Sequence, residues 1–152
     1  MSLKQQIHAD FITAMKARDE NAKAALSSVK AAITNAEKVD GFGDLSDDDV
    51  IKVIIKAIKQ REESVKMYEL ACRDELVRKE SDEICVLQKY MPAQMTPQEI
   101  ADALTGIINR LSETVKNPQA LQGKTIGEFN KAYQGRADIG TVKAILADLI
   151  VQ

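Results

Sequence analysis

Apolar residues recur every three or four positions along most of the chain, which is the period of amphipathic helices. The first stripe comprises Leu3, Ile7, Phe11 and Met15, and further stripes run through residues 22–36, 50–68, 76–87, 100–111 and 142–149. No segment alternates between apolar and polar residues for long enough to indicate a strand. The sequence therefore predicts an all-α fold.

Local signals predict where several helices begin or end. Ser46 stands before three aspartates and is expected to cap the third helix. The segment Thr96–Glu99 combines an N-cap threonine, a proline at the first helical position and a glutamate that can complete a capping box. The glycines of segment 40–44 are expected to end the second helix, because a helix exit commonly needs a positive φ.

The last third of the chain has weaker signals. Asn117-Pro118 indicates a turn within a stretch of poor periodicity, so a short helix is expected only over residues 124–134. Gly135 is expected to stop that helix, and Asp138 to cap the last one.

A domain boundary is expected near Pro92, where proline disfavours helix in the preceding residue. Residues 1–92 are then an N-terminal domain of long helices, and residues 93–152 a small C-terminal domain of three helices. The 152 residues are enough for two small cores of this kind.

Composition narrows the chemistry that the chain can perform. The formal net charge of −2 excludes a strongly basic nucleic-acid module, although it is compatible with a local basic patch. His8, Cys72 and Cys85 are too few ligands for a structural zinc site, and no cofactor is expected. The absence of an apolar run or export signal, with so few cysteines, predicts a cytoplasmic protein with no membrane or DNA partner.

Three candidate catalytic patterns are poor matches. Gly123-Lys124-Thr125 resembles the end of a phosphate-binding loop, but it lacks the preceding strand and the second glycine. Cys72 or Cys85 could pair with His8 as a nucleophile, yet both cysteines are expected to be buried structural residues. Ser27-Ser28 followed by Lys30 falls inside a predicted helix and not in a glycine-rich loop. No complete active site is predicted.

Basic residues repeat along predicted helices. Lys52, Lys56, Lys59 and Lys66 share one face of the third helix, with Arg61 to its side. Lys16, Lys23 and Lys30, spaced by seven, are expected to align on the second helix. Either stripe suits a phosphate backbone or an acidic partner. The alternative is a solvated face neutralised by the carboxylates of Glu62, Glu63 and Glu69.

Two further segments carry charge or glycine. Between residues 73 and 83, Arg73 is expected to pair with Asp74 or Glu80, and Lys79 with Glu83, in a network that fixes a hinge between two helices. In the segments 123–127 and 135–138, glycines allow close approach while Lys124 and Arg136 add positive charge. This arrangement suits an RNA backbone, and simple helix capping is the alternative.

Several short motifs occur together in this chain. They are Lys59-Gln60-Arg61 with Ser64 and Tyr68, Arg73-Asp74-Glu75-Leu76, Lys79-Glu80 with Glu83-Ile84, Tyr90-Met91-Pro92, Gly123-Lys124 with Gly127, and Gly135-Arg136-Ala137-Asp138. In this combination, over essentially the whole chain, the sequence resembles the YqeY proteins. That family is grouped with the tail of the GatB subunit of glutamyl-tRNA amidotransferase.

The resemblance implies a fold and a function. It implies a C-terminal domain of the GatB-tail type, and that tail helps to hold tRNA while other parts of the complex do the chemistry. We therefore expect a tRNA-interacting or amidotransferase-accessory protein whose RNA-binding residues are Lys52, Lys56, Lys59, Lys124 and Arg136. One alternative is an enzyme with carbon–nitrogen ligase activity using glutamine as amide donor, or a tRNA amidase-like activity. A second alternative is a helical adaptor that binds a protein partner.

Overall fold

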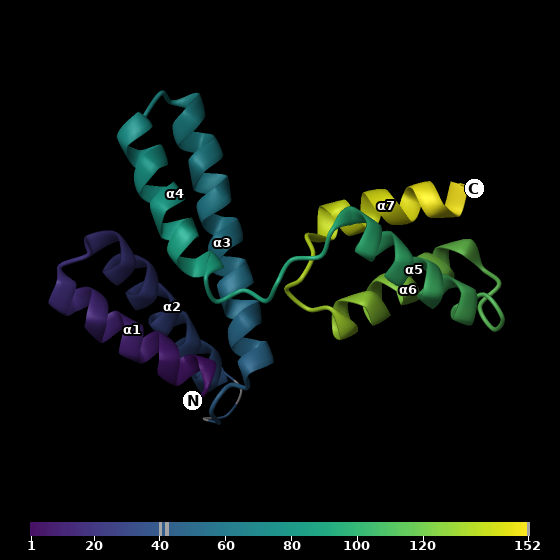
Figure 1. The fold of residues 1–152 in the computed structure, drawn as a ribbon, viewed down its shortest axis with the longest axis horizontal. Helices are drawn as coiled ribbons and strands as arrows, with labels where there is room; N and C mark the ends of the chain where they lie inside the picture. Colours follow the sequence, from purple (N-terminus) through teal and green to yellow (C-terminus); the bar gives the residue numbers. More distant parts are fainter. Residues whose placement is uncertain (40, 42, 152) are drawn as a thin grey trace. The chain divides into compact units, whose positions relative to one another are not determined.

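A computed structural model describes residues 1–39, 41 and 43–151 of the chain, and seven helices account for most of them (Figure 1). These helices are α1 (Leu3–Ala17), α2 (Glu20–Val39), α3 (Asp47–Leu70), α4 (Asp74–Gln88), α5 (Pro97–Leu111), α6 (Pro118–Ala132) and α7 (Ile139–Val151). No strand occurs in the described residues. The prediction of an all-α fold is confirmed.

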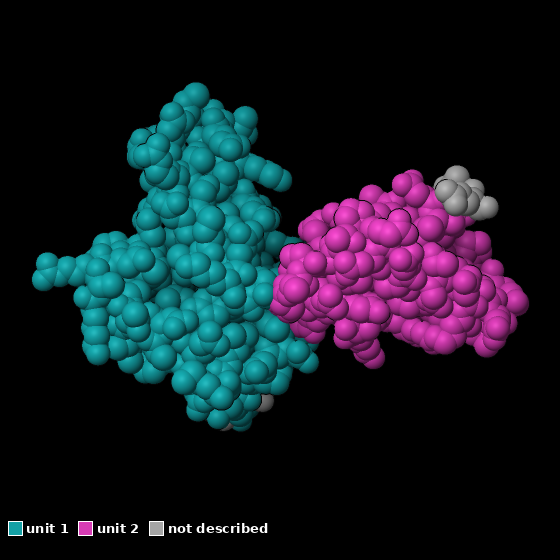
Figure 2. Space-filling model, viewed as in Figure 1, with its two compact units in different colours: residues 1–91 teal, residues 92–152 magenta. Residues whose placement is uncertain are grey.

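The chain divides into two compact units, residues 1–91 and 92–152 (Figure 2). In the first unit, α1 pairs with α2, α3 pairs with α4, and α4 also packs against α2. All four helices contribute to one apolar core, which comprises Ile7, Ala25, Leu26, Val29, Ile33, Val50, Ile54, Ala57, Ile58 and Leu87. The loop between α3 and α4 projects beyond α1 and α2 (Figure 1).

The second unit has its own core, formed where α5 packs against α6 and α7. Its buried members are Ile100, Leu104, Phe129, Val142 and Leu146. The Phe129 ring lies 5.0 Å from that of Tyr133, a spacing typical of favourable aromatic pairs. Each unit therefore buries the apolar face of its own helices.

The N-cap residues predicted from the sequence are confirmed. The Thr96 capping box is incomplete among the described residues, because Glu99 Oε1 accepts from the Thr96 hydroxyl at 3.2 Å and not from the Thr96 backbone N–H. The Oγ of Ser46 and the Oγ1 of Thr96 each accept a hydrogen bond from the backbone N–H three residues later. Asp138 Oδ2 accepts from the N–H of Thr141 at 3.1 Å, as expected for a cap of α7. Gly41 and Gly135 both have positive φ, +93° and +77°. Asp40 and Phe42, also named in the predicted helix exit, lie outside the described residues.

Two expectations about helix position are wrong. The sixth helix begins at Pro118 and not at residue 124, because Asn117 Oδ1 caps it by accepting from the N–H groups of Gln119 and Ala120. Asn-Pro therefore marks a helix start and not a turn. Lys16 lies in the last turn of α1, so it does not continue the stripe of Lys23 and Lys30 on α2.

Among the described residues, no helix combines the length and the apolar character needed to cross a bilayer.

Candidate nucleic-acid interface

The lysine stripe of α3 faces solvent. Val50, Ile54 and Ala57 point into the core, and the opposite face presents the exposed residues Lys52, Lys56, Lys59 and Lys66. Lys52 Nζ lies 3.3 Å from Asp49 Oδ1, so its charge is partly compensated. Within the described part of the chain, no ion pair joins Lys56, Lys59 or Lys66 to a carboxylate.

The neutralising carboxylates proposed from the sequence do not form ion pairs with this stripe. Glu62, Glu63 and Glu69 are all exposed, and within the described ranges none has a lysine or arginine nitrogen within 4 Å. Glu63 nevertheless shares the face with Lys59 and Lys66, since it lies four residues after one and three before the other. Neither Lys56 nor Lys59 forms an ion pair in the described part of the chain, and Lys56 also has no carboxylate three or four residues away on α3.

Arg61 is a structural residue and not part of this surface. Its side chain is 12% exposed, and one guanidinium nitrogen donates to the carbonyl of Ala57 at 3.2 Å. Its Nε lies 3.8 Å from Glu83 Oε2 on α4, too far for a direct hydrogen bond. Burial raises the pKa of the Glu83 carboxyl, and the charge of Arg61 opposes that rise. The pair joins α3 to α4 inside the first unit.

The ion-pair network expected over residues 73–83 is absent from the described residues. Arg73 and Lys79 are exposed and form no ion pair with Asp74, Glu80 or Glu83. Glu83 faces Arg61 on the neighbouring helix because it lies on the buried side of α4. Backbone hydrogen bonds shape the connection between α3 and α4 instead; the N–H of Arg73 donates to Tyr68 O at 2.9 Å.

Tyr90 also serves the fold. Its hydroxyl donates to Asp10 Oδ2 at 2.5 Å, which ties the end of the first unit to α1 across 80 positions of sequence. Burial, followed by this hydrogen bond, raises the pKa of Tyr90 well above its ordinary value. Met91 packs beside it against the first core, and Pro92, half-buried, opens the second unit.

In the second unit, Gly123, Lys124 and Gly127 lie within α6 and not at a helix start as expected. All three are exposed, and a Cβ atom at either glycine would have no neighbour within 4 Å. Thr125, which follows Lys124, is fully buried, and its hydroxyl donates to Leu121 O at 2.7 Å. This helical geometry confirms that Gly123-Lys124-Thr125 is not a phosphate-binding loop.

Arg136 forms a clasp with the segment that precedes α5. Its Nε donates to Ala93 O at 3.0 Å, and its carbonyl accepts from Met95 N–H at 2.8 Å. Gln94 Nε2 adds a bond to Gly135 O at 2.8 Å. The half-buried Arg136 therefore holds the second unit together, and Lys124 is the freer of the two cations predicted to contact RNA there.

The cysteines are not buried, contrary to expectation. Cys72 and Cys85 are both exposed free thiols, because one occupies the α3–α4 loop and the other the solvent side of α4. Cys72 adopts a left-handed conformation with φ +57°. No hydrogen bond joins His8 to either thiol, and no group of three or more metal-ligating side chains occurs, among the residues that the structure describes.

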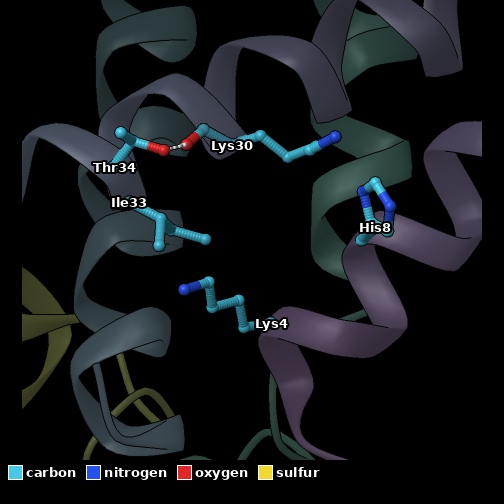
Figure 3. Close-up of a pocket in the computed structure, with 5 residues that line it drawn as sticks. All are labelled: Lys4, His8, Lys30, Ile33 and Thr34. Carbon is cyan, nitrogen blue, oxygen red and sulfur yellow. Dashed lines mark hydrogen bonds between the residues drawn. The ribbon is translucent and has the colours of Figure 1, made fainter. Parts of the chain in front are cut away.

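Sequence reasoning missed a shallow pocket of about 110 Å³ between α1 and α2 (Figure 3). Its lining residues are Lys4, His8, Lys30, Ile33 and Thr34. The polar members are spaced by four on each helix, as Lys4 and His8 on α1 and as Lys30 and Thr34 on α2, so each pair shares a face. The occurrence of two polar pairs spaced by four, one on each of two neighbouring helices, is the sequence signal that could have predicted this pocket.

Comparison with known proteins finds one matching family model and several relatives. The family model described as Yqey-like protein matches residues 4–150. A relative from Clavispora lusitaniae is 29% identical over 118 residues, covering 76% of this chain and 68% of the relative. One from Pyrenophora tritici-repentis is 26% identical, over 87% and 71% of the two chains. One from Kluyveromyces lactis is 31% identical, over 74% and 62%. All three are named "Altered inheritance of mitochondria protein 41, mitochondrial".

These names contradict the expectation of a cytoplasmic location, because they point to mitochondria. The expectation relied on few cysteines and no export signal. Cysteine usage distinguishes oxidising from reducing compartments and does not separate the cytosol from the interior of an organelle. The relatives' names mention neither tRNA nor amide transfer.

Proposed function

Because the chain belongs to the Yqey-like family over residues 4–150, we propose that it is a tRNA-interacting accessory protein that leaves amide-transfer chemistry to other proteins. The observation that carries the proposal is the pair of exposed lysines, Lys56 and Lys59, one helical turn apart on α3 and without a carboxylate partner among the described residues. Uncompensated surface lysines are the groups that neutralise phosphates.

The second unit supports the proposal independently. Lys124 is exposed on α6 between two glycines that leave the helix surface open. Phosphate contacts from lysine position a nucleic acid without reading its sequence. Arg136 contributes less, since its Nε and carbonyl already form the clasp with Ala93 and Met95.

Titration of fluorescently labelled tRNA tests the proposal. We expect binding to the wild-type chain, and several-fold weaker binding to the double variant Lys56→Ala/Lys59→Ala. The variant Glu63→Gln removes the carboxylate from the same face and is expected to strengthen binding. The control Lys38→Ala/Lys89→Ala removes the same charge from other exposed positions. Equal affinities for the two double variants, or no binding at all, would contradict the proposal.

An adaptor function is a second candidate, favoured by exposed apolar side chains at the end of α3. Met67 is 68% exposed and Leu70 85% exposed, next to the projecting loop. Met67 and Leu70 lie three residues apart on α3, and a contact with another protein would bury both side chains. Purification after ribonuclease treatment distinguishes the candidates. A stoichiometric protein that is retained by the wild type and absent with Met67→Ser/Leu70→Ser supports an adaptor.

The amide-transfer alternative has no specific observation in its favour. The thiols of Cys72 and Cys85, which would be the nucleophiles, are exposed on the α3–α4 loop and on α4. Among the described residues, no side chain that could act as a base forms a hydrogen bond with either thiol. An assay of glutamine hydrolysis, repeated with Cys72→Ala and Cys85→Ala, would reveal such an activity if the purified chain has one.

A further inference from the structure

We propose that the pocket between α1 and α2 receives one unpaired nucleobase of the bound RNA, while Lys30 and Lys23 contact the adjoining phosphates. This inference rests on the proposed function and names a recognition element for it. Nothing in the family resemblance assigns a role to this pocket, whose lining residues lie outside the shared motifs.

The size of the pocket limits what it can hold. Its volume of about 110 Å³ is well below the roughly 300–1,000 Å³ of pockets that enclose a whole cofactor. A single ring system or a small ion is the appropriate occupant.

The lining favours a ring. The lining is mainly apolar, with Ile33 buried at its base and the side chains of Lys4, Lys30 and Thr34 around it. The imidazole of His8 stands at one side in Figure 3, exposed and without a recorded hydrogen bond in the described part of the chain. An apolar floor beside an imidazole is a surface on which an unstacked base can lie, as single-stranded RNA is commonly recognised.

The two lysine ammonium groups are held by other groups and do not converge on the pocket, which argues against a phosphate inside it. Lys4 Nζ is held by Glu37 Oε1 at 2.6 Å and by Asp44 Oδ1 at 2.9 Å. Lys30 Nζ lies 4.3 Å from the centre of the Phe11 ring. Figure 3 shows the two ammonium groups pointing in different directions. An oxyanion needs donors that converge on it, and these diverge.

Lys30, which has the Phe11 ring but no carboxylate as a neighbour among the described residues, suits a phosphate outside the pocket. Lys30 forms no ion pair within the described residues, unlike Lys4. Lys23 lies two turns earlier on α2, exposed on the same face and about 10 Å along the helix axis. Together they form a short cationic track that leads to the pocket, which fits a strand whose base turns inward.

A steric block tests the inference. Thr34→Phe places a bulky ring at the exposed edge of the pocket, and Thr34→Val is the matched control because it keeps the volume of threonine. Valine and phenylalanine have similar helix propensities, so α2 should form in both variants. Binding of a short end-labelled single-stranded RNA and of the corresponding duplex is measured by fluorescence anisotropy, alongside labelled tRNA.

We expect the wild type to prefer the single strand, and Thr34→Phe to weaken that binding by about fivefold or more, the loss typical of one stacked base. Thr34→Val should bind like the wild type, and all three proteins should bind the duplex equally. In ¹⁵N-labelled protein, the amide signals of His8 and Thr34 should shift when single-stranded RNA is added.

Equal binding by Thr34→Phe and Thr34→Val, with unshifted His8 and Thr34 signals, would overturn the inference. If tRNA still bound through Lys56 and Lys59 in that case, the proposed function would stand. If the wild type bound no RNA of any kind, both proposals would fail together.

Discussion

Several residues of the family pattern are occupied by contacts within their own unit. Tyr90 donates to Asp10, Arg61 faces Glu83, and Arg136 bonds to Ala93. Side chains held in this way stabilise the fold, and they have fewer donors left for a ligand. Among the solvent-facing cations that remain for the proposed phosphate contacts, Lys56, Lys59 and Lys124 are ones that the sequence also singled out.

Cys72 is expected to cost stability because its left-handed backbone conformation suits glycine. We predict that Cys72→Gly stabilises the chain by about 1 kcal/mol, since an exposed thiol loses little packing and glycine removes the Cβ strain. The matched control is Cys85→Gly, at an exposed position inside α4, which should destabilise by roughly 0.3–0.5 kcal/mol because glycine is a poorer helix former than cysteine. Urea unfolding followed by circular dichroism gives both free energies of unfolding. If the two substitutions change that free energy with the same sign, the left-handed conformation of Cys72 does not cost stability.

Glu83 makes stability depend on pH in a defined direction. Its pKa is raised in the folded chain, so the folded state retains a proton that the unfolded state has already released. Stability from this group is full at acid pH and falls as pH rises through the folded pKa. We predict that Glu83→Gln removes this fall, so its stability relative to wild type improves over the pH range that begins at about 4, the ordinary pKa of a glutamate carboxyl. If the free energies of unfolding of the wild type and Glu83→Gln, measured with urea, change with pH in the same way across that range, the pKa of Glu83 is not raised.

At the scale of the helix, capping residues decide where elements begin. Ser46, Thr96 and Asp138 were predictable from sequence because the hydroxyl or carboxylate of each accepts from the backbone N–H three residues later. Asn117-Pro118 was not, because the same dipeptide is typical of both turns and helix starts. The Asn117 cap and the burial of Thr125 and Phe129 along α6 decide between them in the folded chain.

The start of α6 provides a test at this scale. Asn117→Ala removes the acceptor for two backbone N–H groups and should destabilise the chain by about 1 kcal/mol. Asn109→Ala, at an exposed position inside α5, is the control and should be neutral or slightly stabilising, since alanine favours helix. If both substitutions have the same effect in thermal unfolding, Asn117 does not cap α6.

For the whole molecule, the periodic pattern was sufficient to predict helices and the shared face of the α3 lysines. It was insufficient for contacts between helices distant in sequence. The Arg61–Glu83 pair replaced the local ion pairs expected at residues 73–83, because the buried side of α4 meets α3 only in the folded unit. The exposure of both cysteines and the α1–α2 pocket likewise depend on which helix packs beside which.

Charge across the whole molecule sets the conditions of binding. The net charge of −2 gives no general attraction to RNA, so the proposed binding would have to come from local lysines. A locally cationic surface releases counterions from the nucleic acid on binding, and its affinity therefore falls with salt. This salt dependence separates phosphate binding from apolar association.

The most direct measurement is the slope of log affinity for tRNA against log salt concentration. The account predicts a negative slope for the wild type that becomes shallower by about 1.5 in Lys56→Ala/Lys59→Ala, roughly 0.7–0.9 for each phosphate that the variant no longer neutralises. The control Lys38→Ala/Lys89→Ala should keep the wild-type slope. A slope near zero, or one that is the same in both double variants, would contradict the claim that these lysines hold the RNA backbone.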